Sequence, residues 1–196
     1  MLQVFLVRHG ETAWSLSGRH TGRTDLPLTA RGEAEACRLA GRLQGLVFSA
    51  VLTSPRLRAR QTCDDAGLGP KAEVLPDLSE WDYGDYEGRT TAEIFQTRPG
   101  WDLFRDGCPG GETPAQVAAR ADAVATLLRA REGNVAVFSH GHFLRVLGAR
   151  WAGLPVQAGR NLLLGTASLG ILGYEHGRTG APVIALWNEN CAPSAV

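Results

Sequence analysis

Short apolar runs alternate along the chain with longer segments in which apolar side chains recur every three or four positions. A short apolar run predicts a buried strand, and the longer periodic pattern predicts an amphipathic helix. Strands are predicted at residues 2–7, 48–53, about 74–75, 134–138, 168–174 and 183–187. Helices are predicted at residues 30–43, about 55–65, 91–97, 114 to about 131, and from the 139–142 segment through 151. This alternation indicates an α/β protein with parallel βα units.

Hydroxyl and proline residues mark the beginnings of three helices. Thr29 is expected to cap the first helix, whose apolar face is expected to contain Ala34, Cys37, Leu39 and Leu43. Ser54 is expected to cap the second helix, with Pro55 at its first position. Thr113 and Pro114 precede and open the longest helix in the same way.

Residues 78–108 form a loop-rich insertion that mixes aromatic, glycine, aspartate and proline residues. Its one helical pattern is the short segment 91–97. Insertions of this kind are typical of segments that cover binding sites. No repeat or linker interrupts the sequence, so residues 1–196 are expected to form a single domain.

The composition excludes several classes of partner. The chain has 196 residues, of which 44% are hydrophobic and 20% charged, as in an ordinary globular protein. Lys and Arg balance Asp and Glu at 20 each, so no overall basic field attracts nucleic acid or an anionic membrane. An anion site must therefore be built locally, and neither nucleic acid nor membrane is expected as a partner.

The cysteines and the first apolar run indicate a cytoplasmic protein. Cys37, Cys63, Cys108 and Cys191 are far apart and form no C-x-x-C motif, which fits reduced thiols that serve mostly as small core residues. The first apolar run has no basic residues before it and no cleavage site after it, so it does not resemble a signal peptide. No run approaches the roughly 20 apolar residues of a membrane-spanning helix.

Three predicted strands lead into residues that suit phosphoryl chemistry. The first ends at Arg8 and His9, the second leads into a helix that carries Arg58, and a later one ends at His140. Parallel βα units place these turns at one edge of the sheet, so the four side chains are expected to converge. A neutral imidazole can attack phosphorus, and guanidinium groups bind phosphoryl oxygens. Gly10 lets the backbone approach a bound anion.

Each of these residues also has an ordinary interpretation. A bare Arg-His-Gly triplet recurs by chance at strand ends. Arg58 lies in the run RLRAR, which alone is typical of a solvated helix face. A single His140 is typical of a core or capping histidine. None of the three features would establish a phosphoryl site alone.

Five ordered segments carry a resemblance to a known family. VRHGET, SPRLRARQT, EWDYGDYEG, GCPGGET and FSHGHFLR follow one another between residues 7 and 145. Together they closely resemble the histidine phosphatase superfamily, the phosphoglycerate mutase-like proteins. RHTGRTDLPLT, EWDYGDYEG and GTASLGILGYEHG are most similar to small bacterial acid phosphatases and less closely to fungal sugar-bisphosphate phosphatases. The resemblance implies one histidine phosphatase domain with a three-layer α/β/α fold, whose mostly parallel sheet has an antiparallel edge strand.

The same resemblance implies the catalytic residues. His9 matches the family's nucleophile, Arg8 and Arg58 match its phosphate-binding arginines, and His140 matches its second histidine. Glu80 matches the general acid, which would protonate the leaving oxygen and then activate water. A carboxyl beside Trp81 and apolar surface suits that role. Chemistry alone leaves three nearby rivals for it, Asp82, Asp85 and Glu87.

Substrate-binding residues are also implied by the resemblance. The set is Arg8, Ser15, Thr21, Gly22, Arg58, Tyr83, His140 and Gly141. Thr21 and Gly22 match positions that line the family's phosphate pocket, whereas Ser15 stands where mutases usually have asparagine. His20 and Tyr83 are expected specificity contacts, although His20 could equally be a solvent-exposed loop residue.

The sequence thus predicts a metal-independent phosphomonoester hydrolase that forms a phosphohistidine on His9 and needs no cofactor. Small phosphorylated metabolites, such as sugar phosphates, are the expected substrates. His140 and His142 could be half of a metal site, but no third ligand of suitable spacing accompanies them. Activity is expected to be fastest below neutrality, with Glu80 protonated, His140 cationic and His9 neutral.

Two other functions remain as alternatives, a phosphoglycerate mutase and a phospho-ligand binding module without turnover. The cofactor-dependent mutases that this chain resembles carry a longer, Lys- and Arg-rich insertion after the acid-bearing loop, although some compact members of the family are also called mutases. Here the stretch between Gly88 and Cys108 is short, and its basic residues are Arg89, Arg98 and Arg105. Such a loop leaves the site open to water, which favours hydrolysis. The apolar closing strands would permit a homodimer.

Overall fold

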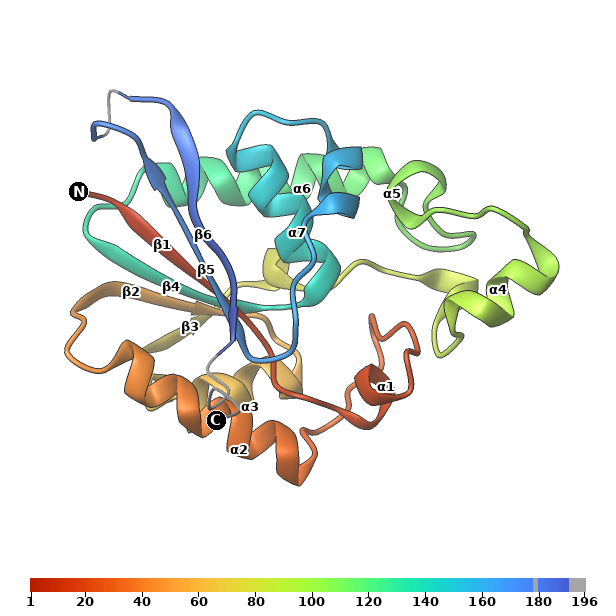
Figure 1. The fold of residues 1–196 in the computed structure, drawn as a ribbon, viewed down its shortest axis with the longest axis horizontal. Helices are drawn as coiled ribbons and strands as arrows, with labels where there is room; N and C mark the ends of the chain where they lie inside the picture. Colours follow the sequence, from red (N-terminus) through yellow and green to blue (C-terminus); the bar gives the residue numbers. More distant parts are fainter. Residues whose placement is uncertain (178–179, 191–196) are drawn as a thin grey trace, which may run out of the picture.

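A single six-stranded sheet forms the centre of the computed structural model, which describes residues 1–177 and 180–190 (Figure 1). The strands lie in the order β3-β2-β4-β1-β5-β6. Their bounds are β1 Gln3–Arg8, β2 Phe48–Thr53, β3 Ala72–Val74, β4 Asn134–Ser139, β5 Ser168–Tyr174 and β6 Pro182–Asn190. β1 to β4 pair in parallel, and β5 runs antiparallel to both of its neighbours. The predicted mostly parallel sheet with an antiparallel edge is therefore confirmed.

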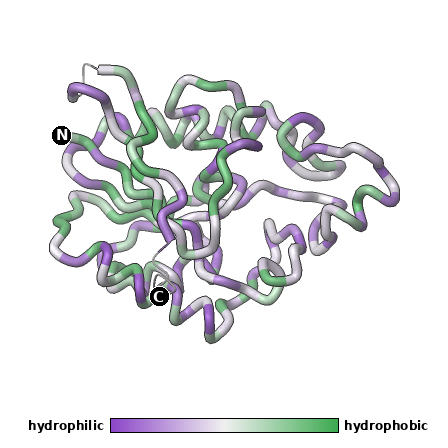
Figure 2. The backbone as a smooth tube through the Cα atoms, in the orientation of Figure 1, coloured by the Kyte–Doolittle hydropathy of each residue, from purple (hydrophilic) through white to green (hydrophobic). Residues whose placement is uncertain are grey.

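Helices cover both faces of the sheet and give the predicted three layers (Figure 1). α2 (Ala30–Leu43) and α3 (Leu57–Asp65) lie on one face, and α6 (Pro114–Arg129) and α7 (Gly141–Trp151) lie on the other. Alternate residues of β1 divide the core between the layers: Val4 and Leu6 join the cluster that contains α6 and α7, and Phe5 and Val7 join the other. Figure 2 shows the apolar residues concentrated along these central strands.

The predicted helix beginnings at Thr29 and Thr113 are confirmed. The Thr29 hydroxyl accepts a hydrogen bond from the Gly32 N–H, and Thr113 forms a capping box with Gln116, with Pro114 at the first position of α6. α6 ends at Arg129, two residues before the predicted end.

The predicted beginning of the second helix is wrong. α3 begins at Leu57, its N-cap is Arg56, and no side chain caps it. The Ser54 hydroxyl lies 2.7 Å from His140 Nε2. Ser54 therefore forms a hydrogen bond with His140, the residue that follows β4. A capping pattern uses only neighbouring residues, so it cannot reveal a contact between residues this far apart in the sequence.

The predicted apolar face of α2 is partly wrong. Ala34 and Cys37 are exposed, and the buried residues of the helix are Gly32, Ala36, Leu39 and Leu43. This set follows the helical spacing more closely than the predicted one. Cys63 and Cys108 are buried as expected, whereas Cys191 lies outside the described residues.

Several short elements differ from the sequence prediction. β3 lies at Ala72–Val74 instead of 74–75, and two helices, α1 (Ala13–Leu16) and α5 (Leu103–Asp106), were not predicted. Single 3-10 turns at Gly69–Lys71, Pro76–Leu78 and Gly84–Tyr86 and a six-residue 3-10 helix at Val156–Asn161 are also present. Elements of three or four residues are too short to show a hydrophobic period. α4 (Thr91–Thr97) lies where it was predicted.

The insertion after residue 78 pairs with the loop that follows β1. The His20 N–H donates to the Arg89 carbonyl, the Gly88 N–H donates to the His20 carbonyl, and Arg19 bridges to Thr90. α4 and α1 therefore lie on the same side of the molecule, beyond the ends of the parallel strands (Figure 1). Within the described part of the chain, no helix is both long and apolar enough to cross a bilayer.

Two glycines let the chain leaving β1 contact α2 directly. A Cβ on Gly10 would lie 2.5 Å from the Gly32 carbonyl oxygen, and a Cβ on Gly32 would lie 2.2 Å from the Glu11 carbonyl oxygen. Backbone at this distance cannot accommodate a methyl group without moving. The contact therefore sets the position of the Arg8-His9 turn relative to α2.

A pair of substitutions in α2 tests this contact. Gly32→Ala should lower the free energy of unfolding by at least about 2 kcal/mol, because the methyl group overpacks the contact with the chain after β1. Gly41→Ala in the same helix has nothing within 4 Å of the new Cβ. It should raise the free energy of unfolding by up to about 1 kcal/mol through helix propensity. Urea unfolding measures both, and equal effects of the two substitutions would contradict the predicted contact.

Candidate active site

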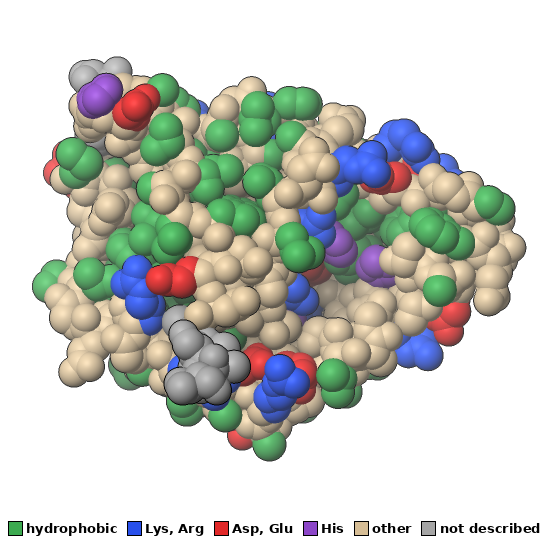
Figure 3. Space-filling view, viewed as in Figure 1, with side chains coloured by type: hydrophobic (Ala, Val, Ile, Leu, Met, Phe, Trp, Pro, Cys, Tyr) green, Lys and Arg blue, Asp and Glu red, His purple; other side chains and the backbone are tan. Residues whose placement is uncertain are grey.

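A cavity of about 270 Å³ opens at the carboxyl edge of the parallel strands. Figure 3 shows the hollow, with histidine and Lys or Arg side chains on its wall. The residues that line it are Arg8, His9, Ser15, Gly18, Arg19, His20, Thr21, Glu80, Tyr83, Thr91, Gly141, His142, Arg145, Leu163 and Leu164. The cavity thus contains residues from β1, from the segment that follows it, from the 78–108 insertion and from α7.

His9 follows directly on β1 and is held in one tautomer. Its Nδ1 lies 2.8 Å from the carbonyl oxygen of Gly10. Because a carbonyl can only accept, Nδ1 carries the proton and Nε2 keeps its lone pair. Burial, followed by the charges of Arg58 and Arg8, holds the pKa of His9 well below 6.5. His9 is therefore a neutral imidazole with a free Nε2, as a nucleophile requires.

Two arginines adjoin His9 in different ways. Arg8 lines the cavity and donates to the Leu164 carbonyl, and its Nε has no hydrogen-bond partner among the described residues. Arg58 lies in the first turn of α3 with no exposed surface. Its guanidinium donates to the carbonyls of Thr21 and Thr24 at 2.9 and 3.0 Å. The expected convergence of both arginines near His9 is observed, but Arg58 does not line the cavity.

His140 is the N-cap residue of α7, and its ring centroid lies 5.3 Å from that of His9. It has no exposed surface. Burial, followed by the charge of Arg58, lowers its pKa well below 6.5. These surroundings favour a neutral His140, because no carboxylate pairs with its ring among the described residues. A cationic His140 during turnover below neutrality stays a prediction.

Glu80 lies at the N-terminus of α7 with 8% of its surface exposed. Oε1 accepts the N–H groups of Trp81 and Phe143 at 2.9 and 2.8 Å, and Oε2 accepts that of His142 at 3.0 Å. Glu80 thus satisfies two N-terminal donors of a helix whose N-cap side chain makes no capping bond. Glu80 is buried beside Trp81, and its carboxyl oxygens also accept backbone N–H groups, which the sequence analysis did not anticipate.

The rival carboxylates are used elsewhere. Asp82 pairs with Arg23 at 2.7 Å, and Glu87 accepts the N–H groups of Gly22 and Thr24. Neither of them, nor Asp85, is among the residues that line the cavity. Of the four candidates in the segment, Glu80 alone reaches it.

The expected substrate-side residues are only partly free to bind. Tyr83, Thr21 and Gly141 line the cavity, and so does Ser15, whose hydroxyl is engaged in the capping box of α1 with Thr12. Gly22 does not line it: a Cβ there would lie 2.7 Å from the Trp81 carbonyl oxygen.

One wall of the cavity is a cluster of aromatic and histidine side chains. His20 packs against Tyr83 with ring centroids 4.8 Å apart, and the Tyr83 hydroxyl lies 2.6 Å from His142 Nδ1. The alternative that His20 is a solvent-exposed loop residue is wrong, because only 9% of its surface is exposed. Within the described residues, no group of three His, Cys, Asp or Glu side chains could hold a metal ion.

Sequence reasoning missed Arg145 and gave His142 no role in a substrate pocket. Both lie on α7 and line the cavity with Gly141. Arg145 lies four positions after Gly141 and three after His142, so helical spacing places it on the same side of the helix as these two residues. That spacing could have identified them once His140 was placed at the beginning of the helix.

Comparison with protein families identifies the chain. The sequence model of the histidine phosphatase superfamily (branch 1) matches residues 4–190. This protein belongs to the histidine phosphatase superfamily. The matched range contains all the residues that the sequence analysis assigned to the site.

Three individual proteins are also similar to this chain in sequence. An acid phosphatase of Mycobacterium tuberculosis is 47% identical over 94% of this chain and 92% of its own length. A sedoheptulose 1,7-bisphosphatase of Saccharomyces cerevisiae is 40% identical over 78% of this chain and 68% of its length. A probable phosphoglycerate mutase of Salmonella choleraesuis is 33% identical over 89% of this chain and 86% of its length.

A solved structure shows that the fold is shared as well. The product of a Mycobacterium tuberculosis open reading frame superimposes with a TM-score of 0.90 and 42% sequence identity. The match covers 97% of this chain and 98% of that one.

The buried histidines should make this histidine phosphatase sensitive to acid. Burial lowers the pKa of His9, His20, His140 and His142, and that of His20 falls from 6.5 to about 4. Below pH 6.5 the unfolded chain therefore binds protons that the folded chain does not, and stability falls as the pH falls. His20 alone should cost about 2 kcal/mol at about pH 5.

Urea unfolding at about pH 7.5 and about pH 5 measures this loss. His20→Gln should remove about 2 kcal/mol of it, whereas His176→Gln, at an exposed position on the turn after β5, should leave it unchanged. A free energy of unfolding that is the same at both pH values would contradict the prediction.

Proposed function

We propose that this protein hydrolyses phosphate monoesters through a covalent phosphohistidine on His9. The observation that carries the proposal is the neutral His9, whose unprotonated Nε2 lies in a cavity beside the cationic Arg8. A phosphoryl dianion would neutralise the charge of Arg8 and meet the imidazole lone pair in the same place. Membership of the histidine phosphatase superfamily supports this assignment.

The reaction has two in-line steps. In the first, the Nε2 lone pair forms an N–P bond while the P–O ester bond breaks, and Glu80 gives its proton to the departing oxygen. In the second, Glu80 takes a proton from a water molecule as the water oxygen attacks phosphorus and the N–P bond breaks. Inorganic phosphate leaves, and both His9 and Glu80 return to their starting states.

The other site residues act around this exchange. Arg8 would bind the equatorial phosphoryl oxygens, with its unpaired Nε–H as one donor. Arg58 and His140 complete the site beside His9, where the charge of Arg58 helps to keep His9 unprotonated. We retain Ser15, Thr21, Gly22, Tyr83 and Gly141 as substrate-binding residues, with Gly22 acting through the position of its loop. Neither a metal ion nor a cofactor takes part in the proposed steps.

Small phosphorylated metabolites such as sugar phosphates are the proposed substrates. A cavity of about 270 Å³ suits a small metabolite better than a phosphoprotein segment. Relatives named as an acid phosphatase and a sugar bisphosphatase are more similar to this chain than the relative named as a probable mutase. A single domain over residues 1–196, a homodimer and a cytoplasmic location stay predictions.

Removal of the nucleophile should abolish turnover. His9→Ala should lower kcat/KM for p-nitrophenyl phosphate by at least about 10³-fold, because no other group replaces Nε2. His176→Ala, at an exposed position, serves as the control and should retain full activity. Wild-type protein quenched during turnover should carry acid-labile, base-stable phosphate. Retained activity in His9→Ala would overturn the mechanism.

Hydrolysis and phosphoglycerate mutase activity can be separated in one assay. The protein receives 3-phosphoglycerate with catalytic 2,3-bisphosphoglycerate, in the presence of a chelator, and both 2-phosphoglycerate and free phosphate are followed. We expect phosphate release to exceed interconversion, because only α4, α5 and short loops lie between Gly88 and Cys108 to exclude water. Interconversion that outruns phosphate release would favour the mutase.

A further inference from the structure

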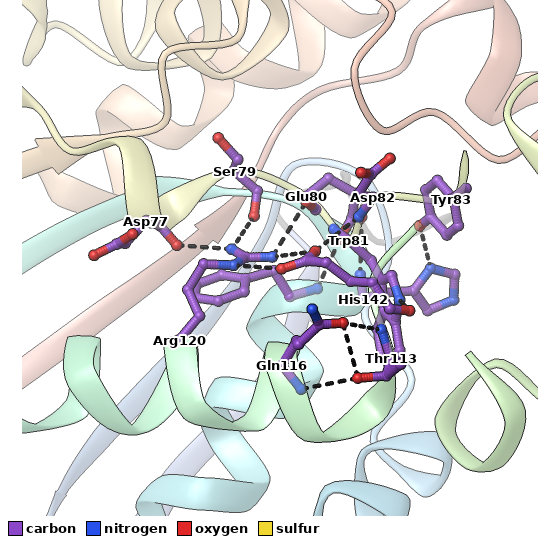
Figure 4. A network of polar contacts seen from close by, with 12 residues as sticks. Asp77, Ser79, Glu80, Trp81, Asp82, Tyr83, Thr113, Gln116, Arg120 and His142 are labelled. Atoms are coloured by element: carbon purple, nitrogen blue, oxygen red, sulfur yellow. Dashed lines mark hydrogen bonds and ion pairs between the residues drawn. The ribbon is translucent and has the colours of Figure 1, made fainter. Parts of the chain in front are cut away.

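The segment that carries Glu80 is held by one side chain of α6. Arg120 Nη1 donates to the carbonyls of Asp77 and Ser79 at 2.8 and 2.6 Å, and Nη2 lies 3.3 Å from the carbonyl of Glu80 itself (Figure 4). Three carbonyls within four consecutive residues thus converge on one guanidinium. The segment has no helix or strand of its own between Leu78 and Gly84 to hold it.

Arg120 is itself fixed on two sides. Glu112 binds it in a bidentate pair, with Nε–Oε1 and Nη2–Oε2 distances of 3.0 and 2.8 Å. The guanidinium also lies over the ring of Phe143, 4.4 Å from its centroid. The bidentate pair and the stacking on Phe143 together fix the orientation of the guanidinium plane. An ammonium group is not planar and could not make both contacts in this way.

The two residues that fix Arg120, Glu112 and Phe143, also bind Glu80 or the residues after it. The N–H of Phe143 donates to Glu80 Oε1, so the ring that supports Arg120 belongs to a residue that binds the acid. Glu112 Oε2 also accepts the Asp82 N–H at 2.8 Å, and its carbonyl accepts the indole N–H of Trp81. The backbone is therefore held just before and just after Glu80 by one Arg120–Glu112 pair.

We propose that Arg120 is a positioning residue for proton transfer by Glu80. Arg120 does not line the substrate cavity, so it acts through Glu80 and not on the phosphoryl group. A general acid must lie within hydrogen-bond reach of the leaving oxygen, and a shift of about 1 Å is costly. The inference rests on the proposed role of Glu80 as the acid.

The dependence of activity on the leaving group separates positioning from structural support. p-Nitrophenolate leaves without a proton, whereas an alkoxide such as that from β-glycerol phosphate requires one. The value of kcat/KM reports only the steps up to the first irreversible one. It therefore reflects phosphoryl transfer from the ester to His9 and does not depend on the later hydrolysis of the phosphohistidine. Weak positioning of Glu80 should therefore reduce kcat/KM for the alkyl ester selectively.

Arg120→Met should lower kcat/KM for β-glycerol phosphate by about 10- to 100-fold and that for p-nitrophenyl phosphate by less than about 3-fold. The matched control is Arg129→Met. Arg129 lies on the same helix, stacks on Trp151 of α7 at 5.0 Å and donates to the Trp151 carbonyl, away from the cavity. This control should leave both values within about 2-fold, although it removes a comparable helix–helix contact.

Further variants separate the possible outcomes. Arg120→Lys keeps the charge and should show a smaller selective loss of kcat/KM for β-glycerol phosphate. If Arg120→Met does not fold, Arg120→Lys takes its place in the test. Glu80→Gln should show the largest selective loss. Equal losses on both esters in the two Arg120 variants, with a selective loss in Glu80→Gln, would overturn the positioning role alone. No selective loss in Glu80→Gln would overturn the assignment of Glu80, and this inference with it.

Discussion

The site depends on keeping a histidine uncharged in contact with buried positive charge. His9 lies next to Arg8 in the chain and close to Arg58, and both charges oppose its protonation. Its Nδ1–H is committed to the Gly10 carbonyl, so Nε2 is the nitrogen left to react. A phosphoryl dianion that enters the cavity would neutralise the positive charges of these arginines. In the proposed mechanism, the same electrostatic arrangement would therefore bind the phosphoryl group and keep the nucleophile unprotonated.

Parallel strands bring this arrangement together. β1 and β4 are neighbours in the sheet and end at Arg8 and Ser139, so His9 and His140 emerge side by side. β2 lies on the other side of β4, and the helix after it carries Arg58 to the same edge. The close contact of Gly10 with Gly32 then holds the first of these turns against α2.

The proposed acid, Glu80, reaches the site by a different route, because it lies on a segment without regular structure. Glu80 is held at the N-terminus of α7, whose first N–H groups its carboxyl accepts. Arg120 of α6 holds the backbone of the same segment through its carbonyls. The packing of α6 on α7 therefore helps to determine where Glu80, the proposed acid, lies relative to His9, although neither helix carries Glu80.

The sequence by itself determined the order of the six strands and of the longer helices α2, α3, α4, α6 and α7, because apolar periodicity and the caps at Thr29 and Thr113 are local properties. The order of its motifs also selected the family and indicated His9 as the proposed nucleophile. It could not determine that Ser54 meets His140 instead of capping a helix, since those residues are 86 positions apart. Nor could it show that burial lowers the pKa of His140 or that Arg120 holds the backbone beside Glu80. Burial and long-range hydrogen bonds decide those properties, and both exist only once the layers have packed.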